Sequence, residues 1–312
     1  MQLTRLKLEA VRGLNLNLAL PSGLFVFTGP PTSGKTTVLE AIAGLKEHVG
    51  GSGPAPRASR FFQAGTAGDI VATFKLDEAA RRSLELPTSE LELAWNNAGH
   101  KPAVNAWLRR YDRSPASFKI EYFHAGRSLL NGDFNGAMRA ELRLTRDASK
   151  YAWVRAYLVE SSREAGAQAL GALRESGVLL ASEVGRDQAF AKRLAAMTQR
   201  LHFVGCEQTD AGWDCVFARP GGRRVELAEL STSESMFVLF AAAIEGLGLH
   251  RSLLLIDHPE QGLHPEEHAR FLEALVASLP DAQLLVTTTS PGILRAVPRE
   301  RVVVLSGDAG LA

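Results

Sequence analysis

The stretch from Gly29 to Thr36 reads Gly-Pro-Pro-Thr-Ser-Gly-Lys-Thr, and it constrains this chain more than any other segment. It fits the phosphate-loop pattern of Gly, four variable positions and Gly-Lys-Thr. Its glycines allow a backbone in which successive N–H groups point at phosphate oxygens. Lys35 is the residue type that reaches the β and γ phosphates of ATP, and the Thr36 hydroxyl is a Mg²⁺ ligand in such loops. The predicted nucleotide-binding residues are Gly29, Pro30, Pro31, Thr32, Ser33, Gly34, Lys35, Thr36 and Thr37.

The flanking sequence supports this interpretation. Residues 24–28, Leu-Phe-Val-Phe-Thr, predict a short buried strand, and residues 37–47 predict a helix. The helix N-terminus then lies behind the bound phosphates, where its dipole favours anions. A glycine-rich turn that matches the pattern by chance is the alternative, and the order strand, loop, helix argues against it.

Composition and charge exclude several classes of protein. Of the 312 residues, 46% are apolar and 22% are charged, which is typical of a globular α/β protein with a full core. No apolar run approaches the roughly 20 residues of a membrane span, so no membrane partner is expected. The first nine residues alternate between polar and apolar, unlike a signal or transit peptide, and Cys206 and Cys215 lack metal-ligand spacing. These features predict a cytoplasmic protein with free thiols, although the two cysteines could also pair across neighbouring strands.

Hydrophobic periodicity predicts an α/β fold with a mainly parallel sheet, an antiparallel β subdomain and a mostly helical insertion. A hairpin is expected over residues 3–20, with loops or turns at 50–59 and 97–99. Further strands are expected at 70–76, 90–96, 118–123, 202–205, 214–218, 224–227, 253–257, 283–287 and 301–305. Helices are expected over 148–176 and 190–201 and from residues 233 and 265. We therefore predict a nucleotide-binding head in two parts, 1–125 and 201–312, separated by an insertion at 126–200.

A second segment with candidate binding chemistry is the apolar stretch 253–257, Leu-Leu-Leu-Ile-Asp. Asp257 at the carboxyl end of a buried strand predicts a carboxylate beside Thr36 that holds Mg²⁺, usually through water. Four apolar residues followed by Asp are common by themselves. After a phosphate loop in an alternating chain, the Mg²⁺-binding interpretation is favoured.

Five parts of the sequence resemble ABC-type ATPase heads of the SMC, RecF and OLD (overcoming-lysogenization-defect) group. Residues 257–265, Asp-His-Pro-Glu-Gln-Gly-Leu-His-Pro, are similar to the Asp-Glu-Pro-Glu…Leu-His-Pro segment of those heads. Residues 230–234, Leu-Ser-Thr-Ser-Glu, resemble their Leu-Ser-Ser-Gly-Glu signature, and residues 286–291 resemble their Thr-His-Ser-Pro switch segment. Arg12 lies where such heads carry an arginine-containing turn, and residues 121–127 resemble their tyrosine-to-arginine segment. The matches are colinear and cover about two-thirds of the chain, excluding the insertion.

The resemblance implies a homodimer in which each ATP lies between the phosphate loop of one subunit and the signature of the other. Ser231, Ser233 and Glu234 are then cofactor-binding residues, together with Arg12. From the residues alone, Ser231 or Ser233 capping an amphipathic helix is the simpler interpretation. Their order along the chain with the other motifs favours the signature.

The chain departs from the family at three positions. His258 follows Asp257 where the family has the glutamate that polarises the attacking water, and Thr289 replaces the switch histidine. Imidazole can act as a base near neutral pH, although Mg²⁺ and Lys35 disfavour its protonated form. Glu260 lies two residues later, an offset that could place its carboxylate on the same side as His258 as a substitute. Ser233 replaces a glycine, and Gln63 is a candidate lid glutamine. The predicted catalytic residues are His258, Glu260 and Thr289; ATP binding is expected, and hydrolysis is expected to be slow or absent.

Residues 101–155 contain eleven Lys and Arg against five Asp and Glu, and aromatic residues are interspersed, among them Trp107, Tyr111, Phe134, Tyr151 and Trp153. Such a stretch, Lys101 to Arg155, could bind nucleic acid, but a solvated surface with core aromatics is the simpler interpretation. No acidic cluster of a metal-dependent nuclease is visible, so an effector or nuclease would be a separate chain.

The resemblance implies a switch acting on a partner protein or DNA, in repair or in defence against phage or plasmids. A catalytically silent ATP-binding scaffold and, less favoured, a transporter-coupled subunit are the alternatives.

Overall fold

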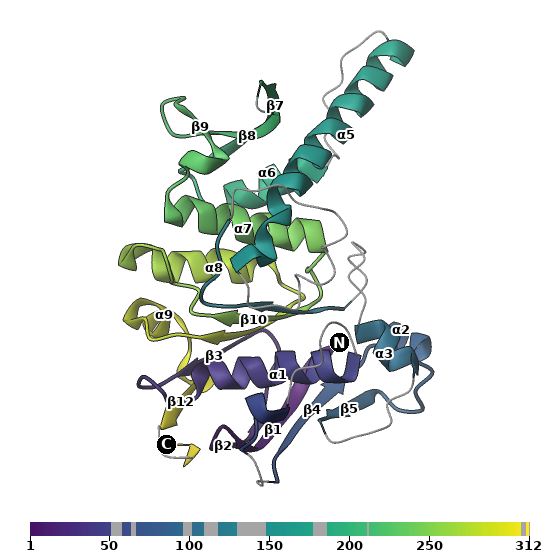
Figure 1. Ribbon diagram of the computed structural model, residues 1–312, viewed down its shortest axis with the longest axis vertical. Coiled ribbons are helices and arrows are strands. Elements are labelled where there is room, and N and C mark those ends of the chain that lie inside the picture. The colour runs from purple at the N-terminus through teal and green to yellow at the C-terminus, as the bar shows by residue number, and fades with distance from the viewer. Residues whose placement is uncertain are drawn as a thin grey trace. The chain divides into compact units, whose positions relative to one another are not determined.

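The computed structural model describes residues 1–50, 58–63, 67–95, 102–108, 118–129, 148–176, 186–210, 212–306 and 310–311. These residues belong to two compact units. The first unit consists of Met1–Ala125, Leu249–Gln261 and Pro265–Ala312, so both ends of the chain build it (Figure 1). The second unit consists of Gly126–Gly248 and Gly262–His264, and it therefore contains residues 201–248 together with the helices of the insertion.

A six-stranded sheet in the order β13-β12-β3-β11-β10-β6 forms the centre of the first unit. The five strands from β12 to β6 are parallel, and β13 is antiparallel to β12. Strands β10 and β11 are buried along their whole length, as expected for parallel strands with both faces covered. The strands are β3 (Leu24–Thr28), β6 (Ile120–Phe123), β10 (Leu253–Asp257), β11 (Gln283–Thr287), β12 (Val302–Ser306) and β13 (Gly310–Leu311).

A second, antiparallel sheet of this unit has the order β2-β1-β4-β5. Its strands are β1 (Gln2–Val11), β2 (Leu14–Ala19), β4 (Asp69–Lys75) and β5 (Glu90–Ala94). Helix α1 (Lys35–Gly50) contacts strands of both sheets, and apolar side chains of α1 and of the two sheets form one continuous core. This packing fixes α1, and therefore the loop that precedes it, relative to the carboxyl ends of the parallel strands.

The remaining elements of the first unit are short helices and α8. They are η1 (Ala58–Arg60), α2 (Glu78–Ser83), α3 (Pro102–Leu108), η5 (Pro265–Glu267), α8 (His268–Ser278), α9 (Pro291–Ala296) and η6 (Arg299–Arg301). Ser290 caps α9 by accepting a hydrogen bond from the backbone N–H of Ile293 at 3.3 Å. Helix α9 thus begins directly after the turn that follows β11.

The second unit combines helices with a three-stranded antiparallel sheet, β7-β8-β9. Its elements are η3 (Ala148–Tyr151), α5 (Trp153–Ser176), α6 (Arg186–Met197), β7 (His202–Thr209), β8 (Gly212–Ala218), β9 (Arg224–Glu226), η4 (Leu227–Glu229) and α7 (Thr232–Leu247). Helix α7 packs closely on α5, because a Cβ at Gly246 would lie 2.7 Å from the Trp153 ring. Cys206 and Cys215 are free and face each other across β7 and β8, with sulfur atoms 2.9 Å apart.

The structure confirms the predicted strands and helices, with shifts of a few residues at their ends. Strands β3, β10 and β11 begin and end where the apolar runs predicted them. Helix α8 begins at His268, because residues 265–267 form the 3₁₀ turn η5 instead of its first turn. The predicted loop at 50–59 and the turn at 97–99 lie largely or wholly outside the described residues. None of the described helices has the length and apolarity that a membrane span requires.

Candidate functional site

The loop from Gly29 to Thr36 joins β3 to α1 at the carboxyl edge of the parallel sheet. Gly29, Thr32 and Gly34 have positive φ angles of 143°, 65° and 90°. A Cβ at Gly29 would lie 2.2 Å from the backbone oxygen of Leu305 in β12, so only glycine fits between the two strands. The loop conformation therefore depends on residue types that the phosphate-loop pattern specifies.

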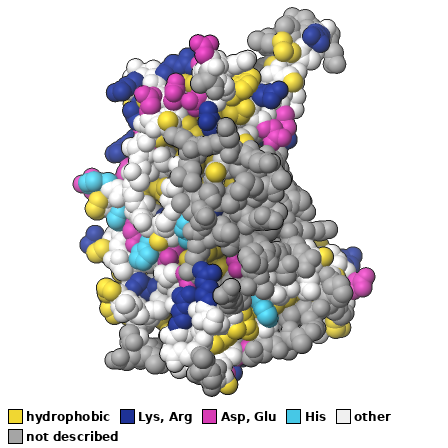
Figure 2. Space-filling model, in the orientation of Figure 1, with side chains coloured by type: hydrophobic (Ala, Val, Ile, Leu, Met, Phe, Trp, Pro, Cys, Tyr) yellow, Lys and Arg dark blue, Asp and Glu magenta, His cyan; other side chains and the backbone are white. Residues whose placement is uncertain are grey.

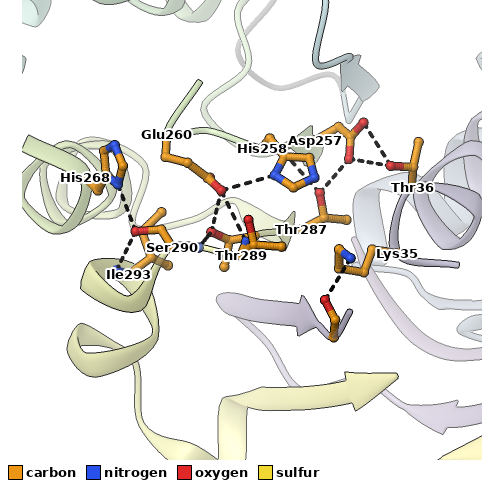
Figure 3. A network of polar contacts seen from close by, with 12 residues as sticks. Lys35, Thr36, Asp257, His258, Glu260, His268, Thr287, Thr289, Ser290 and Ile293 are labelled. Atoms are coloured by element: carbon orange, nitrogen blue, oxygen red, sulfur yellow. Dashed lines mark hydrogen bonds and ion pairs between the residues drawn. The ribbon is translucent and has the colours of Figure 1, made fainter. Parts of the chain in front are cut away.

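Lys35 is buried at the base of this loop, with 6% of its surface exposed. Its Nζ donates hydrogen bonds to the backbone oxygens of Gly29 at 2.9 Å and Pro30 at 2.7 Å (Figure 3). Burial lowers the pKa of Lys35, while the nearby carboxylates of Asp257 and Glu260 act in the opposite direction. The ammonium group is thus held at the loop, where an anionic ligand gains both charge and donors.

Thr36 and Asp257 bring two oxygen-bearing side chains together from α1 and β10. The Thr36 hydroxyl lies 2.9 and 3.1 Å from the two Asp257 carboxylate oxygens. Thr287, at the end of the intervening strand β11, donates its hydroxyl to Asp257 Oδ1 at 2.5 Å. Asp257 is 3% exposed, so its carboxylate is oriented within a nearly solvent-free pocket. A hydroxyl beside a carboxylate is the oxygen-donor combination that Mg²⁺ takes in phosphate-loop proteins.

His258 and Glu260 lie in the turn that follows β10. His258 has a φ of 50°, a strained conformation for a non-glycine residue, and its backbone N–H donates to the Thr287 backbone oxygen and hydroxyl, each at 3.1 Å. The His258 ring nitrogen Nδ1 lies 3.1 Å from Glu260 Oε1. The same oxygen accepts hydrogen bonds from the Thr288 hydroxyl at 2.8 Å and the Thr289 backbone N–H at 3.2 Å (Figure 3).

These contacts change the electrostatics that the sequence suggested. The hydrogen bond to Glu260 raises the pKa of His258 above its usual value, and this effect outweighs burial and the charge of Lys35, which lower it. Burial acts to raise the pKa of Glu260, but the hydrogen bonds from His258, from its own backbone N–H and from Thr288 bring the pKa below the usual value. The pair therefore behaves as a hydrogen-bonded carboxylate and imidazole, and Lys35 does not dominate it.

A cavity of about 360 Å³ lies over the loop and is lined by Pro31, Thr32, Ser33, Gly34, Lys35, Thr36, Thr37, His258 and Thr289. The Ser33 hydroxyl oxygen is buried and has no hydrogen-bond partner among the described residues, and it points into the glycine-containing turn. Buried hydroxyls normally have partners, so this oxygen fits a loop that receives a polar ligand. The donors, the left-handed backbone and the cavity fit the triphosphate of ATP, and Thr36 with Asp257 fit Mg²⁺. No group of three or more His, Cys, Asp or Glu side chains within the described ranges forms a separate metal site.

Two further predicted residues of the first unit lie elsewhere. The Arg12 guanidinium contacts the buried Glu40 carboxylate of α1 at 2.6 Å and the backbone oxygen of Arg60 at 2.9 Å. It is therefore engaged in fixing the β1–β2 turn to α1. Gln63 is exposed in the segment after η1 and makes no polar contact with a described residue. Neither side chain lines the cavity.

The signature segment belongs to the second unit and begins α7. The Ser231 hydroxyl caps the helix, and Glu234 reaches back to the Ser231 backbone N–H at 2.7 Å. Both carboxylate oxygens of Glu234 accept hydrogen bonds from Arg219 at 2.7 Å, which lowers the pKa of Glu234 to about 2. Ser233 donates its hydroxyl to the Gly262 backbone oxygen at 2.9 Å. The helix start is thus held rigidly, with Ser231 exposed.

Comparison with known proteins agrees with this geometry. Residues 217–295 match the family described as "AAA domain, putative AbiEii toxin, Type IV TA system". No curated protein sequence matches the chain. Among solved structures, an Smc head bound to the C-terminal winged-helix domain of ScpA has 13% sequence identity, covers 100% of this chain and 98% of its own, and gives a TM-score of 0.61.

The chain has the fold of an SMC head domain. Two other head domains support this conclusion. The Pyrococcus furiosus Smc head with an extended coiled coil, bound to the C-terminal domain of ScpA, has 12% identity, coverages of 99% and 95%, and a TM-score of 0.57. The Thermotoga maritima SMC head has 13% identity, coverages of 100% and 98%, and a TM-score of 0.51. The expected resemblance to ABC-type heads and the expected α/β phosphate-loop fold are both confirmed.

Several residues of the site were not found by sequence reasoning. Thr287 and Thr288 orient Asp257 and Glu260, and Arg219 clamps Glu234 from a distant strand end. The threonine run 287–289 at the end of an apolar strand was a usable signal. A strand that lies between the strand of the phosphate loop and the strand of Asp257 must end beside both of them. Nothing near Arg219 in the sequence indicated its role.

Proposed function

We propose that this protein binds Mg·ATP at Gly29–Thr37 in the cytoplasm, dimerises around the nucleotide and uses the bound state to switch a partner. The observation that carries the proposal is the meeting of Lys35, Thr36 and Asp257 at one edge of the sheet. Lys35 and the loop N–H groups bind phosphate oxygens, while Thr36 and Asp257 hold the metal. Bound Mg²⁺ supplies positive charge that offsets the charge on the phosphates.

The dimer is the finer part of the proposal. The rigid, capped start of α7 at Ser231–Glu234 presents backbone N–H groups and a favourable helix dipole to an anion. In a two-fold dimer, this end of one subunit meets the nucleotide on the loop of the other. Two of the three compared Smc heads are bound to domains of ScpA, and by analogy the partner switched here is a protein or DNA, in repair or in defence.

Nucleic acid is a weaker candidate partner. Much of the basic stretch from Lys101 to Arg155 lies outside the described residues. Figure 2 shows side chains of both signs over the described part of the viewed face, in keeping with the net charge of +1. A separate effector or nuclease chain is the partner that we favour.

The proposal is tested by measuring ATP affinity and solution mass with Mg²⁺ present. We expect Mg·ATP to shift the light-scattering mass from 33.7 kDa toward twice that value. Lys35→Ala should weaken ATP binding about tenfold or more, because a buried charge-assisted contact is worth roughly 1.5–3 kcal/mol. Lys75→Ala, at an exposed position in β4, is the matched control and should bind as the wild type does. An ATP affinity that is the same in both variants would contradict the proposal.

A catalytically silent scaffold is the second candidate, and His258 and Thr289 motivate it. In that case ATP binds and the dimer forms, but phosphate release stays at the background rate. His258→Glu combined with Thr289→His should then restore release. Release by the wild type that disappears in Lys35→Ala would reject the scaffold and establish an ATPase.

A further inference from the structure

Glu260 holds two strand ends together through a single carboxylate oxygen. Its side chain is 11% exposed and lies in the turn after β10. Oε1 receives hydrogen bonds from the Thr288 hydroxyl and the Thr289 backbone N–H, which follow β11, and it lies 3.1 Å from His258 Nδ1. Glu260 does not line the cavity over the phosphate loop, whereas His258 and Thr289 do. Glu260 therefore reaches the cavity only through these neighbours.

The contact with Glu260 determines the orientation of the His258 ring. An ionised carboxylate can only accept hydrogen bonds, so Nδ1 carries the proton in its contact with Glu260 Oε1. Nε2 lies on the opposite edge of the ring, on the side of Lys35 and Thr36 in Figure 3. The strained φ of His258 and the two contacts of its backbone N–H with Thr287 fix the ring from the other end. Nε2 of His258 is thus a hydrogen-bond acceptor in a defined position at the cavity.

We propose that Glu260 is a positioning residue for ATP hydrolysis, which fixes His258 in the Nδ1–H tautomer and directs Nε2 toward the water that reacts. In this arrangement His258 and Glu260 together replace the single glutamate that the related heads carry after the aspartate. Thr289 is held at the cavity wall by the same carboxylate. The inference rests on the proposed function, because it requires Mg·ATP in the neighbouring loop.

The charge of Glu260, rather than its size, distinguishes it from glutamine at this position. The second oxygen, Oε2, is buried and has no hydrogen-bond partner among the described residues. An unpartnered buried carboxylate oxygen destabilises the folded state. Glutamine has the same size and retains an acceptor oxygen, but it carries no charge. The charge matters for holding the Nδ1 proton of His258.

The first test reads the tautomer directly and needs no activity. Long-range ¹H–¹⁵N spectra of ¹⁵N-histidine-labelled protein should show His258 as the Nδ1–H form, assigned by the signal lost in His258→Asn. Glu260→Gln should shift His258 toward the Nε2–H form or into a mixture of both. Glu273→Gln, an exposed position on α8, makes the same charge change and should leave the spectrum unchanged. A His258 signal that is identical in wild type and Glu260→Gln overturns the proposal.

The second test is a double-mutant cycle on phosphate release. His258→Ala should lower kcat about a hundredfold, the lower end of what a positioned acid or base contributes. Glu260→Gln should lower kcat about tenfold in the wild-type background and by less than about twofold in the His258→Ala background, because its effect passes through the ring. KM and ATP affinity should stay within about threefold throughout. Thr288→Val, which removes another donor to Oε1, should give a smaller decrease of the same kind.

The outcomes distinguish failure of ATP binding from failure of the role of Glu260. Loss of ATP binding in the wild type contradicts the proposed function itself. Normal ATP binding with phosphate release at background contradicts the role of Glu260. Equal decreases from Glu260→Gln in both backgrounds show that Glu260 acts on the water directly and also overturn the proposal. If Glu260→Gln fails to fold, as judged by its melting temperature, Thr288→Val carries both tests.

Discussion

Gly29 is the residue at which the geometry of the loop is least tolerant. Its φ of 143° disfavours any side chain, and a Cβ would lie 2.2 Å from the Leu305 backbone oxygen and 2.8 Å from the Ser33 hydroxyl. Backbone atoms of a neighbouring strand cannot move away without loss of sheet pairing. We therefore expect Gly29→Ala to displace the loop from β12 and to weaken ATP binding more than tenfold, measured with a fluorescent ATP analogue.

The control for this prediction is Gly23→Ala. Gly23 also has a positive φ, 76°, but a Cβ there meets nothing within 4 Å. Gly23→Ala should lower the free energy of unfolding by about 1 kcal/mol, because alanine is strained in the left-handed backbone conformation. Its ATP affinity should be unchanged. Equal ATP affinities for the two variants would show that the close approach at Gly29 is not required.

The residues of the loop were predictable, but the neighbours of His258 were only partly so. A two-residue offset suggested that Glu260 could lie on the same side as His258. The sequence could not reveal the left-handed φ at His258, which depends on backbone contacts to Thr287 in another strand. Nor could it reveal that Glu260 bonds the turn after β11, because that contact joins residues 28 positions apart.

At the scale of elements, burial explains which boundaries the sequence determined well. Strands β10 and β11 are buried at every residue, so their apolar runs end where the chain reaches the cavity edge. Surface elements carry weaker signals. The first turn after residue 264 forms the 3₁₀ helix η5, because its polar residues bury nothing that would select an α-helix.

The start of α7 gives a prediction about pH. Arg219 holds the pKa of Glu234 at about 2, compared with 4.5 for an ordinary Glu. The unfolded chain takes up a proton first as the pH falls, so the stabilisation is complete above about pH 4.5 and is lost toward pH 2. The full shift corresponds to roughly 3 kcal/mol, but solvent reaches this pair and screens it, so we expect about 1 kcal/mol.

Urea unfolding of wild type and Glu234→Gln measures this contribution. The wild type should be more stable by about 1 kcal/mol at pH 7, and the difference should shrink between pH 4.5 and 2.5. Glu207→Gln is the matched control, because Glu207 pairs with Arg224 in an exposed setting where ion pairs contribute little. A difference that stays constant with pH would show that the Arg219 contact does not depend on the Glu234 charge.

At the scale of the whole molecule, two distant parts of the sequence build one site. The phosphate loop and the strand ends after β10 and β11 are more than 200 residues apart, and pairing of β3 with β11 brings them together. The order of the motifs along the sequence predicted this meeting. No motif indicated that residues 201–248 pack with the insertion helices, because apolar faces make that packing.

The proposed dimer can be tested with two variants. One is defective in the phosphate loop and the other in the signature segment, which together would enclose each ATP. Lys35→Ala removes the loop cation, and Ser233→Arg places a bulky side chain at the signature while leaving the Ser231 cap in place. Each variant alone should remain at 33.7 kDa with Mg·ATP. Their mixture can form a heterodimer with one intact site, composed of the loop of the Ser233→Arg subunit and the signature of the Lys35→Ala subunit. We expect light scattering to detect a dimer in the mixture, at a lower fraction than in the wild type.

The control mixture combines Lys35→Ala with the double variant Lys35→Ala/Ser233→Arg, which shares the same surfaces but can form no intact site. It should remain monomeric, because neither subunit carries a loop that binds ATP. A dimer in the control mixture would mean that association does not pass through the nucleotide. A monomer in the complementing mixture, when the wild type dimerises, would mean that the signature of one copy does not meet the loop of the other.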